Sequence, residues 1–174
     1  MKSASIYKAV GEYKHFELCR FCGSNNIQMV IDLGFMPLAG GFIKNIKQKN
    51  EEKVYPLQLT FCRDCFLLQT NSSINPDTLF KDYFYFSSSI KTLVEHFENI
   101  ASDLPKFLPN PNDKFVIEIG ANDGVFIKAL QKNGYKALGI DPATNVVEPA
   151  IKKGIPILNT YFTQVLAQEI VKKY

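Results

Sequence analysis

The sequence lacks a long apolar run, an apolar leader and a cluster of basic residues. No run approaches the roughly 20 apolar residues that span a bilayer, and the first eight residues lack the apolar core of a secretory signal. Twenty basic residues against 17 acidic ones give a formal charge of +3, without the clustering that nucleic-acid binding needs. We therefore expect a cytoplasmic protein with neither a membrane nor a nucleic acid as its partner.

Histidine and arginine are also scarce. His15 precedes the first cysteine, and His96 falls among apolar residues at helical spacing, so we expect His96 to be structural. Arg20 and Arg63 lie one inside each cysteine pair. Coincidence in a lysine-rich chain is the favoured explanation. The alternative is that the guanidinium groups offset thiolate charge or bind an anion nearby. Apolar residues are abundant, at 46% against 21% charged, which predicts a globular chain, and the length of 174 residues favours one domain or two small ones.

The four cysteines form two identical Cys-x2-Cys pairs, Cys19/Cys22 and Cys62/Cys65. Such a turn brings two sulfurs to the separation that a tetrahedral ion needs, and two turns complete a four-thiolate shell. Zinc is the expected metal because it is redox-inert and four sulfurs leave no open position. Two alternatives stay open. The first is two disulfides, which would suit a secreted protein, although the sequence shows no export signal. The second is a thioredoxin-like redox motif, although such a motif usually has one Cys-x2-Cys pair and this chain has two.

The patterning divides the chain into three parts. Residues 1–77 are predicted to form a β-rich module organised by zinc, and residues 78–112 a connector with a dense aromatic run. The turn-rich stretch 109–113 marks the start of the third part, 113–174. In the first two parts we expect strands over 27–33 and 55–61, a polar excursion over 44–53 and a helix over 88–103.

Strands and helices alternate in the third part. This order predicts a parallel sheet with right-handed crossovers. The expected strands cover 115–119, 136–140 and 155–158, and the expected helices cover 125–133, 145–153 and 163–173.

A glycine-containing turn follows the first of these strands, in the pattern Glu118-x-Gly120-x-Asn122-x-Gly124. Glycines let the backbone approach a ligand, and the helix start offers free N–H groups. Asp141, at the end of the next strand, is placed to accept hydrogen bonds from both hydroxyls of a ribose. The turn is not a dinucleotide fingerprint, so a ligand with a ribose but no pyrophosphate fits, such as S-adenosylmethionine (SAM). An ordinary strand-turn-helix is the alternative.

These motifs, taken in order, resemble the zinc-containing sugar C-methyltransferases, which act on nucleotide-linked 4-keto-deoxysugars, as the tylosin-type C3-methyltransferase does. The resemblance covers nearly the whole chain. It rests on the two cysteine pairs and on the stretches Tyr83 to Ser88, Glu95 to Phe97, Val116 to Gly124 and Gly139 to Pro142.

The resemblance implies an α+β zinc-binding module followed by an α/β class I methyltransferase domain, Rossmann-like with a doubly wound parallel sheet, here incomplete. Tyr83 and Tyr85 match a stretch that faces the active site, where a phenol would orient the keto sugar or relay a proton. Aromatic packing between two modules is the alternative for both tyrosines. Glu118 and the turn backbone would hold the methionine end of SAM, and Asp141 its ribose. The cofactor contacts so assigned are Glu118, Gly120, Asn122, Gly124 and Asp141.

The implied chemistry is abstraction of a proton beside the ketone, giving an enolate that attacks the methyl group on a sulfonium. The family places its base candidates beyond Tyr174, so we expect a fragment or truncated product that is inactive alone. Its short sheet would leave an exposed edge at 155–158, which favours homo-oligomers. The alternative function is a non-catalytic zinc module with half a SAM domain, acting as an assembly partner. A zinc-ribbon nucleic-acid binder is disfavoured because no basic stripe interleaves the aromatics.

Overall fold

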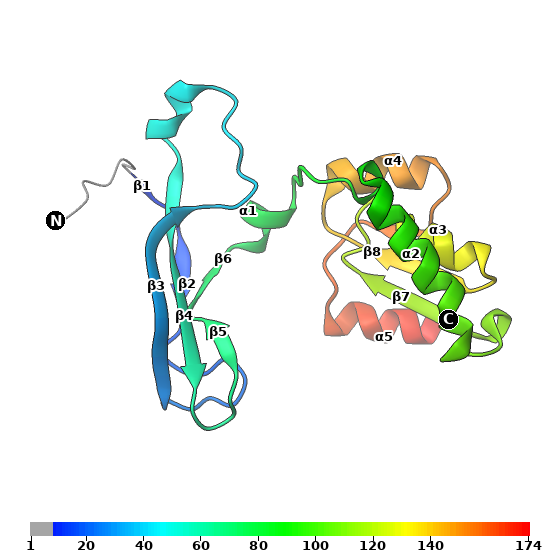
Figure 1. The fold of residues 1–174 in the computed structure, drawn as a ribbon, viewed down its shortest axis with the longest axis horizontal. Coiled ribbons are helices and arrows are strands. Elements are labelled where there is room, and N and C mark those ends of the chain that lie inside the picture. Colours follow the sequence, from blue (N-terminus) through cyan, green and yellow to red (C-terminus); the bar gives the residue numbers. More distant parts are fainter. Residues whose placement is uncertain (1–8) are drawn as a thin grey trace. The chain divides into compact units, whose positions relative to one another are not determined.

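The computed structural model describes residues 9–174 and divides the chain into two compact units, Met1–Leu79 and Phe80–Tyr174 (Figure 1). The residues predicted as a connector, 78–112, therefore group almost wholly with the second unit. Across residues 9–174, no helix combines the length and the apolar character that a membrane crossing requires.

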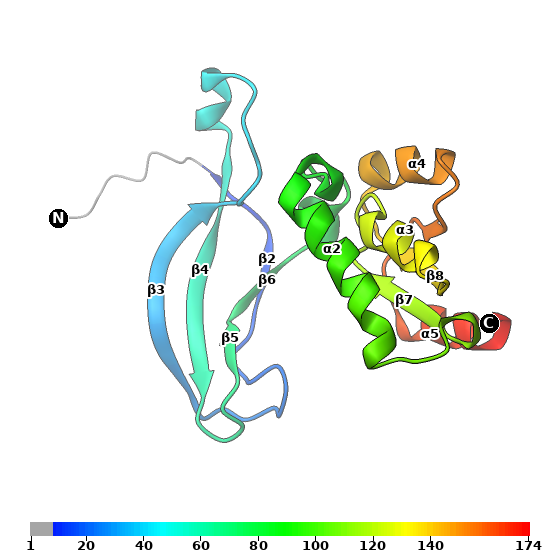
Figure 2. The same ribbon diagram turned by 45° about the vertical axis from the view of Figure 1, so that its right-hand side comes forward.

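The first unit is built on a long antiparallel strand pair, β3 (Ile27–Pro37) and β4 (Lys53–Cys62) (Figure 2). β4 also pairs with β1 and β5, and β2 pairs with β6 in a separate two-stranded sheet. The shorter elements are β1 (Ala9–Val10), β2 (Tyr13–His15), η1 (Ile46–Asn50), β5 (Leu68–Thr70), β6 (Ser72–Ile74) and α1 (Pro76–Phe80). Both strands predicted here are confirmed, and both are longer than predicted.

This unit buries few apolar side chains. Nearly every residue of β3 is exposed, including Leu33 at 58% and Phe35 at 48%. Within residues 9–174, the clusters of packed, buried hydrophobic residues all belong to the second unit. Small domains with little core usually depend on disulfides or metals for stability. The first unit therefore needs a source of stability other than apolar burial.

The second unit contains a three-stranded parallel sheet in the order β7-β8-β9, as the alternating pattern predicts. Helices α2, α3 and α4 pack on one face of the sheet and α5 packs on the other (Figure 1). The elements are η2 (Ser87–Ser89), α2 (Lys91–Asp103), η3 (Leu104–Lys106), η4 (Pro111–Asp113), β7 (Phe115–Ile119), α3 (Val125–Lys132), β8 (Lys136–Ile140), α4 (Thr144–Lys152), β9 (Ile157–Leu158) and α5 (Gln164–Lys173).

The last strand is shorter than the predicted range 155–158. Ile155 and Pro156, the first two residues of that range, are not part of β9. The N–H of Ile155 donates to Ala150 at the end of α4, and Pro156 has no N–H to give. Only Ile157 and Leu158 pair with β8 as strand residues.

Gly139 in β8 is expected to tolerate no side chain. A Cβ atom there would lie 2.7 Å from the Cβ of Ala121 and 3.1 Å from Ile157, so Gly139→Ala should overpack the contacts of β8 with the turn after β7 and with β9. We expect a loss of about 1–3 kcal/mol in the unfolding free energy of the second unit, measured by urea denaturation. Lys136→Ala, at an exposed position of the same strand, should stay within about 0.5 kcal/mol of the wild type. Equal effects of the two substitutions would contradict this reasoning.

Candidate functional site

The first unit brings the four predicted metal ligands together. The Sγ atoms of Cys19, Cys22, Cys62 and Cys65 all lie within 4.8 Å of one another. Two of these separations, Cys19 to Cys65 and Cys22 to Cys62, are 3.6 Å. A zinc ion with Zn–S bonds of about 2.3 Å requires sulfurs about 3.8 Å apart in a tetrahedron. The four cysteines are not joined by disulfides, so the donor set and its spacing fit zinc.

Two similar turns create this arrangement. The N–H of Gly23 donates to Cys19, and the N–H of Phe66 donates to Cys62, so each turn closes four residues after its first cysteine. Both closing residues have a positive φ, 75° for Gly23 and 63° for Phe66. Glycine adopts this conformation without strain, whereas phenylalanine rarely does. The conformation at Phe66 is thus held by the turn and not by the preference of its own side chain.

The two arginines next to the ligands have partners other than the thiolates. The guanidinium of Arg63 donates to Gln28, and that of Arg20 lies 4.6 Å from the ring centre of Phe16. The carboxylate of Asp64 accepts hydrogen bonds from Ser24 and Asn26 and so links the two turns. These contacts favour coincidence as the explanation for the two arginines, because their guanidinium groups contact Gln28 and Phe16.

The sulfurs differ in acidity. The backbone N–H of Cys22 lowers the pKa of the Cys19 thiol to about 6. At Cys65 the backbone N–H of Leu67 acts in the same direction, but burial and the neighbouring thiols outweigh it and raise the pKa to about 12. A metal ion must therefore displace protons from this site when it binds, because only thiolates are ligands.

In the second unit, the predicted cofactor residues meet at the carboxyl ends of β7 and β8. The turn after β7 passes through positive φ at Gly120 (77°), Asn122 (50°) and Gly124 (75°). Its start is anchored to β8, because the N–H groups of Gly120 and Ala121 both donate to the carbonyl of Ile140. A Cβ atom at Gly120 would meet nothing within 4 Å. The turn therefore has an open side next to its backbone.

Asp141 fixes this turn. One carboxylate oxygen accepts from the backbone N–H of Asn122 at 2.8 Å, and the other accepts from the N–H of Ala143 at 2.8 Å. The side chain is buried, with 8% of the residue exposed. Each oxygen keeps a second acceptor position. Asp141 thus holds the two loops at the end of the sheet together and can still accept further hydrogen bonds.

Glu118 has an unsatisfied carboxylate oxygen at the turn. Its Oε2 atom is buried and has no hydrogen-bond partner in residues 9–174. Burial, followed by the negative charges of Asp141 and Asp123, raises the pKa of Glu118 to about 7. Three carboxylates therefore gather at one turn, and two of them, Glu118 and Asp123, have a buried oxygen that no group in residues 9–174 donates to. Such a cluster attracts a positively charged ligand.

Tyr83 and Tyr85 are half-buried in a stretch without helix or strand. Their backbone is bound by side chains from the glycine turn and from the first turn of α4, at the end of the sheet. The carbonyl of Tyr85 accepts from Asn122, and Tyr83 exchanges two hydrogen bonds with Asn145. Asn145 was not predicted, because a single asparagine 62 residues away from Tyr83 forms no local sequence pattern.

The two histidines lie outside this site. His15 is exposed in β2, and His96 is exposed in α2 with its ring 6.0 Å from Phe97. His96 is therefore not buried in the apolar stripe as expected. That stripe packs through Phe97, whose ring stacks on Phe126 at 5.4 Å.

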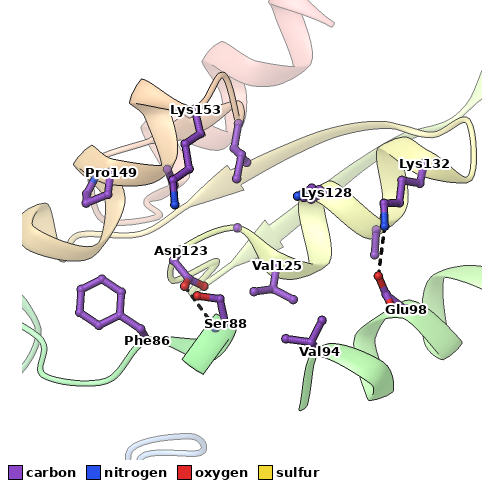
Figure 3. A pocket seen from close by; sticks show the side chains of 14 residues that line it. Phe86, Ser88, Val94, Glu98, Asp123, Val125, Lys128, Lys132, Pro149 and Lys153 are labelled. Atoms are coloured by element: carbon purple, nitrogen blue, oxygen red, sulfur yellow. Dashed lines mark hydrogen bonds and ion pairs between the residues drawn. The ribbon is translucent and has the colours of Figure 1, made fainter. Parts of the chain in front are cut away.

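A cavity of about 260 Å³ lies between α2, α3 and α4 (Figure 3). Its lining includes Asp123 from the turn, Phe86 from the aromatic stretch and three lysines, of which Lys132 is paired with Glu98 at 3.1 Å. Glu118 and Asp141 do not line it. Gly124, one of the predicted cofactor contacts, does line it, so the cavity adjoins the turn that is predicted to bind the cofactor.

Both units have matches among known proteins. The Methyltransf_13 family model, described as a zinc binding domain, matches residues 19–80. Over 156 residues the chain is 28% identical to C-methyltransferase NovU of Streptomyces niveus. The chain is similar to a C-methyltransferase. This match confirms the resemblance inferred from the motifs, and the first unit is a zinc-binding module with four cysteines.

The two proteins differ in length. The match covers 90% of this chain but 37% of the C-methyltransferase, so the chain spans just over a third of that curated relative. The matched part includes both cysteine pairs and most of the sheet region, since only a tenth of the chain lies outside it. The similarity therefore extends past the zinc-binding module into the second unit.

Proposed function

We propose that this chain supplies the zinc-binding module and the cofactor-binding turn of a SAM-dependent C-methyltransferase that acts on a nucleotide-linked 4-keto-deoxysugar. The observation that carries the proposal is the acidic turn, where Glu118 has a buried oxygen without a partner beside Asp141 and Asp123. The similarity to a C-methyltransferase supports the reaction class. The nucleotide sugar is proposed from the family resemblance.

The residues at the turn fit SAM in charge and in hydrogen bonding. SAM has a sulfonium and an ammonium group, and an ammonium would provide the donor that Glu118 Oε2 lacks. The ribose hydroxyls would use the remaining acceptor positions of Asp141. The open side of Gly120 lets a ligand approach the backbone. These three features stand next to one another along β7, the turn and β8.

When bound, SAM supplies a methyl group activated on sulfur. The part of this chain would be to bind and orient: Glu118 neutralises a cation, and Asp141 holds both the loop and the ribose. Tyr83 and Tyr85 would orient the keto sugar, since their backbone is tied to the same loops. Binding energy used to align two reactants lowers the entropic part of the barrier.

The test is the pH dependence of SAM binding, measured by titration calorimetry. If the ionised form of Glu118 binds the ammonium, a pKa of about 7 should make the affinity rise about tenfold from pH 6 to pH 8, because the competent fraction rises by that factor. Glu118→Gln should bind more weakly and show no such rise.

A matched control is Glu169→Gln, at an exposed position on α5. It should keep both the affinity and the pH dependence of the wild type. Affinity that does not vary with pH in the wild type would remove Glu118 from the cation site. Absence of SAM binding at every pH would refute the proposed function.

A further inference from the structure

The aromatic segment, residues 81–88, has almost no regular backbone pairing. Its residues 81–86 belong to neither a helix nor a strand, and residues 87–88 start the short helix η2. Backbone N–H and C=O groups at such a place are usually satisfied by turns, side chains or water. Here most of the partners come from the glycine turn and from the first turn of α4, both at the carboxyl end of the parallel sheet.

Asn145, in the first turn of α4, binds the segment at Tyr83. The N–H of Tyr83 donates to Asn145 Oδ1 at 3.0 Å, and Asn145 Nδ2 donates to the carbonyl of Tyr83 at 2.7 Å. The neighbouring N–H of Thr144 donates to Lys81 at 3.3 Å. The amide of Asn145 therefore pairs with Tyr83 as a facing residue of an antiparallel strand would.

Asn122, in the glycine turn, binds the segment two and four residues further on. Asn122 Nδ2 donates to the carbonyl of Tyr85 at 2.9 Å, and the N–H of Ser87 donates to Asn122 Oδ1 at 2.9 Å. The N–H of Ser88 then donates to Asp123 at 3.2 Å. Asn122 is buried, with 8% exposed, and its own N–H is held by Asp141. The segment, the turn and Asp141 thus form one connected hydrogen-bond network.

We propose that Asn122 and Asn145 are positioning residues for the methyl transfer, whose side-chain amides hold Tyr83 and Tyr85 in a fixed place relative to the cofactor-binding turn. The inference rests on the proposed function for its chemistry, and on the observed hydrogen bonds for its geometry. Fixing the backbone at residues 83, 85 and 87 leaves the two phenols few orientations to sample. Binding of SAM at the turn would then change the environment of both tyrosine side chains.

The residue types at these positions match the role. The asparagine side chain has both a donor and an acceptor, whereas aspartate has acceptors only and glycine has no side chain. Asparagine also tolerates the positive φ of 50° at position 122. Asn122→Gly therefore keeps the backbone conformation and the N–H to Asp141 while deleting both bonds to the segment. Asn145→Ala deletes the pair at Tyr83 from an exposed first helical turn.

Hydrogen exchange read by mass spectrometry on the 174-residue chain tests the geometry without any ligand. In both Asn122→Gly and Asn145→Ala, the amides of residues 81–88 should exchange at least tenfold faster than in the wild type. The control Asn133→Ala removes an amide that donates to Ala129 at the end of α3, so it should leave the segment unchanged. Wild-type exchange of the segment in both asparagine variants would overturn the proposal.

A second measurement separates positioning from a general structural role. In protein labelled with 3-fluorotyrosine, SAM should shift the fluorine resonance of Tyr83, assigned with Tyr83→Phe. In Asn145→Ala, SAM should bind within about threefold of the wild-type affinity, while the shift is lost. A parallel loss of affinity, or an unchanged shift, would overturn the positioning role. If the wild type binds no SAM, the proposed function fails. The exchange experiment still tests whether Asn122 and Asn145 fix the backbone of residues 81–88.

Discussion

Replacing Cys62 with serine is expected to unfold the first unit and to leave the second unit folded. Two of the four ligands are buried, Cys62 fully and Cys19 at 3% exposed, whereas Cys22 is exposed and Cys65 is intermediate. The unit around them has little apolar core of its own. Zinc binding to four-cysteine and similar sites contributes about 10–16 kcal/mol, and that free energy drives folding. Removal of one thiolate should therefore cost more stability than the unit has.

The measurement combines zinc stoichiometry with exchange protection in each unit. The wild type, purified without added zinc, should hold near one equivalent, and Cys62→Ser should hold far less. Protection should vanish in β3 and β4 but persist in β7 and β8, which have their own buried residues. A strong chelator should reproduce this pattern in the wild type, more readily at low pH because protons compete for the thiolates.

Thr60→Ser serves as the matched control. Thr60 is 3% exposed, and its hydroxyl donates to the carbonyl of Gln69, a bond that serine can keep. This variant tests whether any substitution at a buried position of β4 causes loss of zinc and of exchange protection, as Cys62→Ser is expected to do. It should retain zinc and protection. Folding of Cys62→Ser without metal, or disulfides in the purified wild type, would refute the zinc assignment.

The second unit was predictable because its signals are local. The β-branched run at 115–119 coincides with β7, and the helix predicted over 125–133 ends within one residue of α3. Gly134, with a φ of 85°, ends α3 in the way that glycine commonly does. The strand at 155–158 was overestimated, since propensity does not reveal that the N–H of Ile155 is already used by the preceding helix.

The first unit was less predictable because its pairings are distant. β3 continues four residues past the predicted end at position 33, through a bulge at Gly34, since β4 provides partners for Phe35 and Met36. In the stretch predicted as a polar excursion, Asn45 and Gln48 form a capping box that starts η1. The cysteine cluster was found nonetheless, because its spacing is a local signal within each turn.

At the second site, the sequence indicated the residues but not their state. The strand-end position of Asp141 and the glycines of the turn follow from the motif alone. That Glu118 has a buried oxygen without a partner depends on packing that no short pattern encodes. The same holds for Asn122, which was predicted to contact the cofactor and which uses its side chain to bind Tyr85 and Ser87.

The second large effect is expected at Asp141, where substitution should damage folding and ligand binding together. In Asp141→Asn the side chain keeps its shape, but its amide must turn an NH2 group toward the N–H of either Asn122 or Ala143. One buried N–H is then unsatisfied, and the other has lost its charged acceptor. Hydrogen bonds to charged groups contribute about 1.5–3 kcal/mol each, so we expect the second unit to lose about 3 kcal/mol.

SAM affinity should fall at least tenfold in the same variant, at a temperature where it is still folded, because the ribose hydroxyls lose a charged acceptor and the turn loses its anchor. Calorimetry would give the affinity and urea denaturation the stability. Asp103→Asn is the control, since Asp103 is exposed on α2 and pairs with Lys106 at 2.7 Å. An exposed pair contributes about 0.2–1 kcal/mol, so its loss should change stability slightly and affinity not at all. Wild-type SAM affinity in Asp141→Asn would remove Asp141 from the ribose site, and wild-type stability would show that its two backbone bonds do not hold the loops.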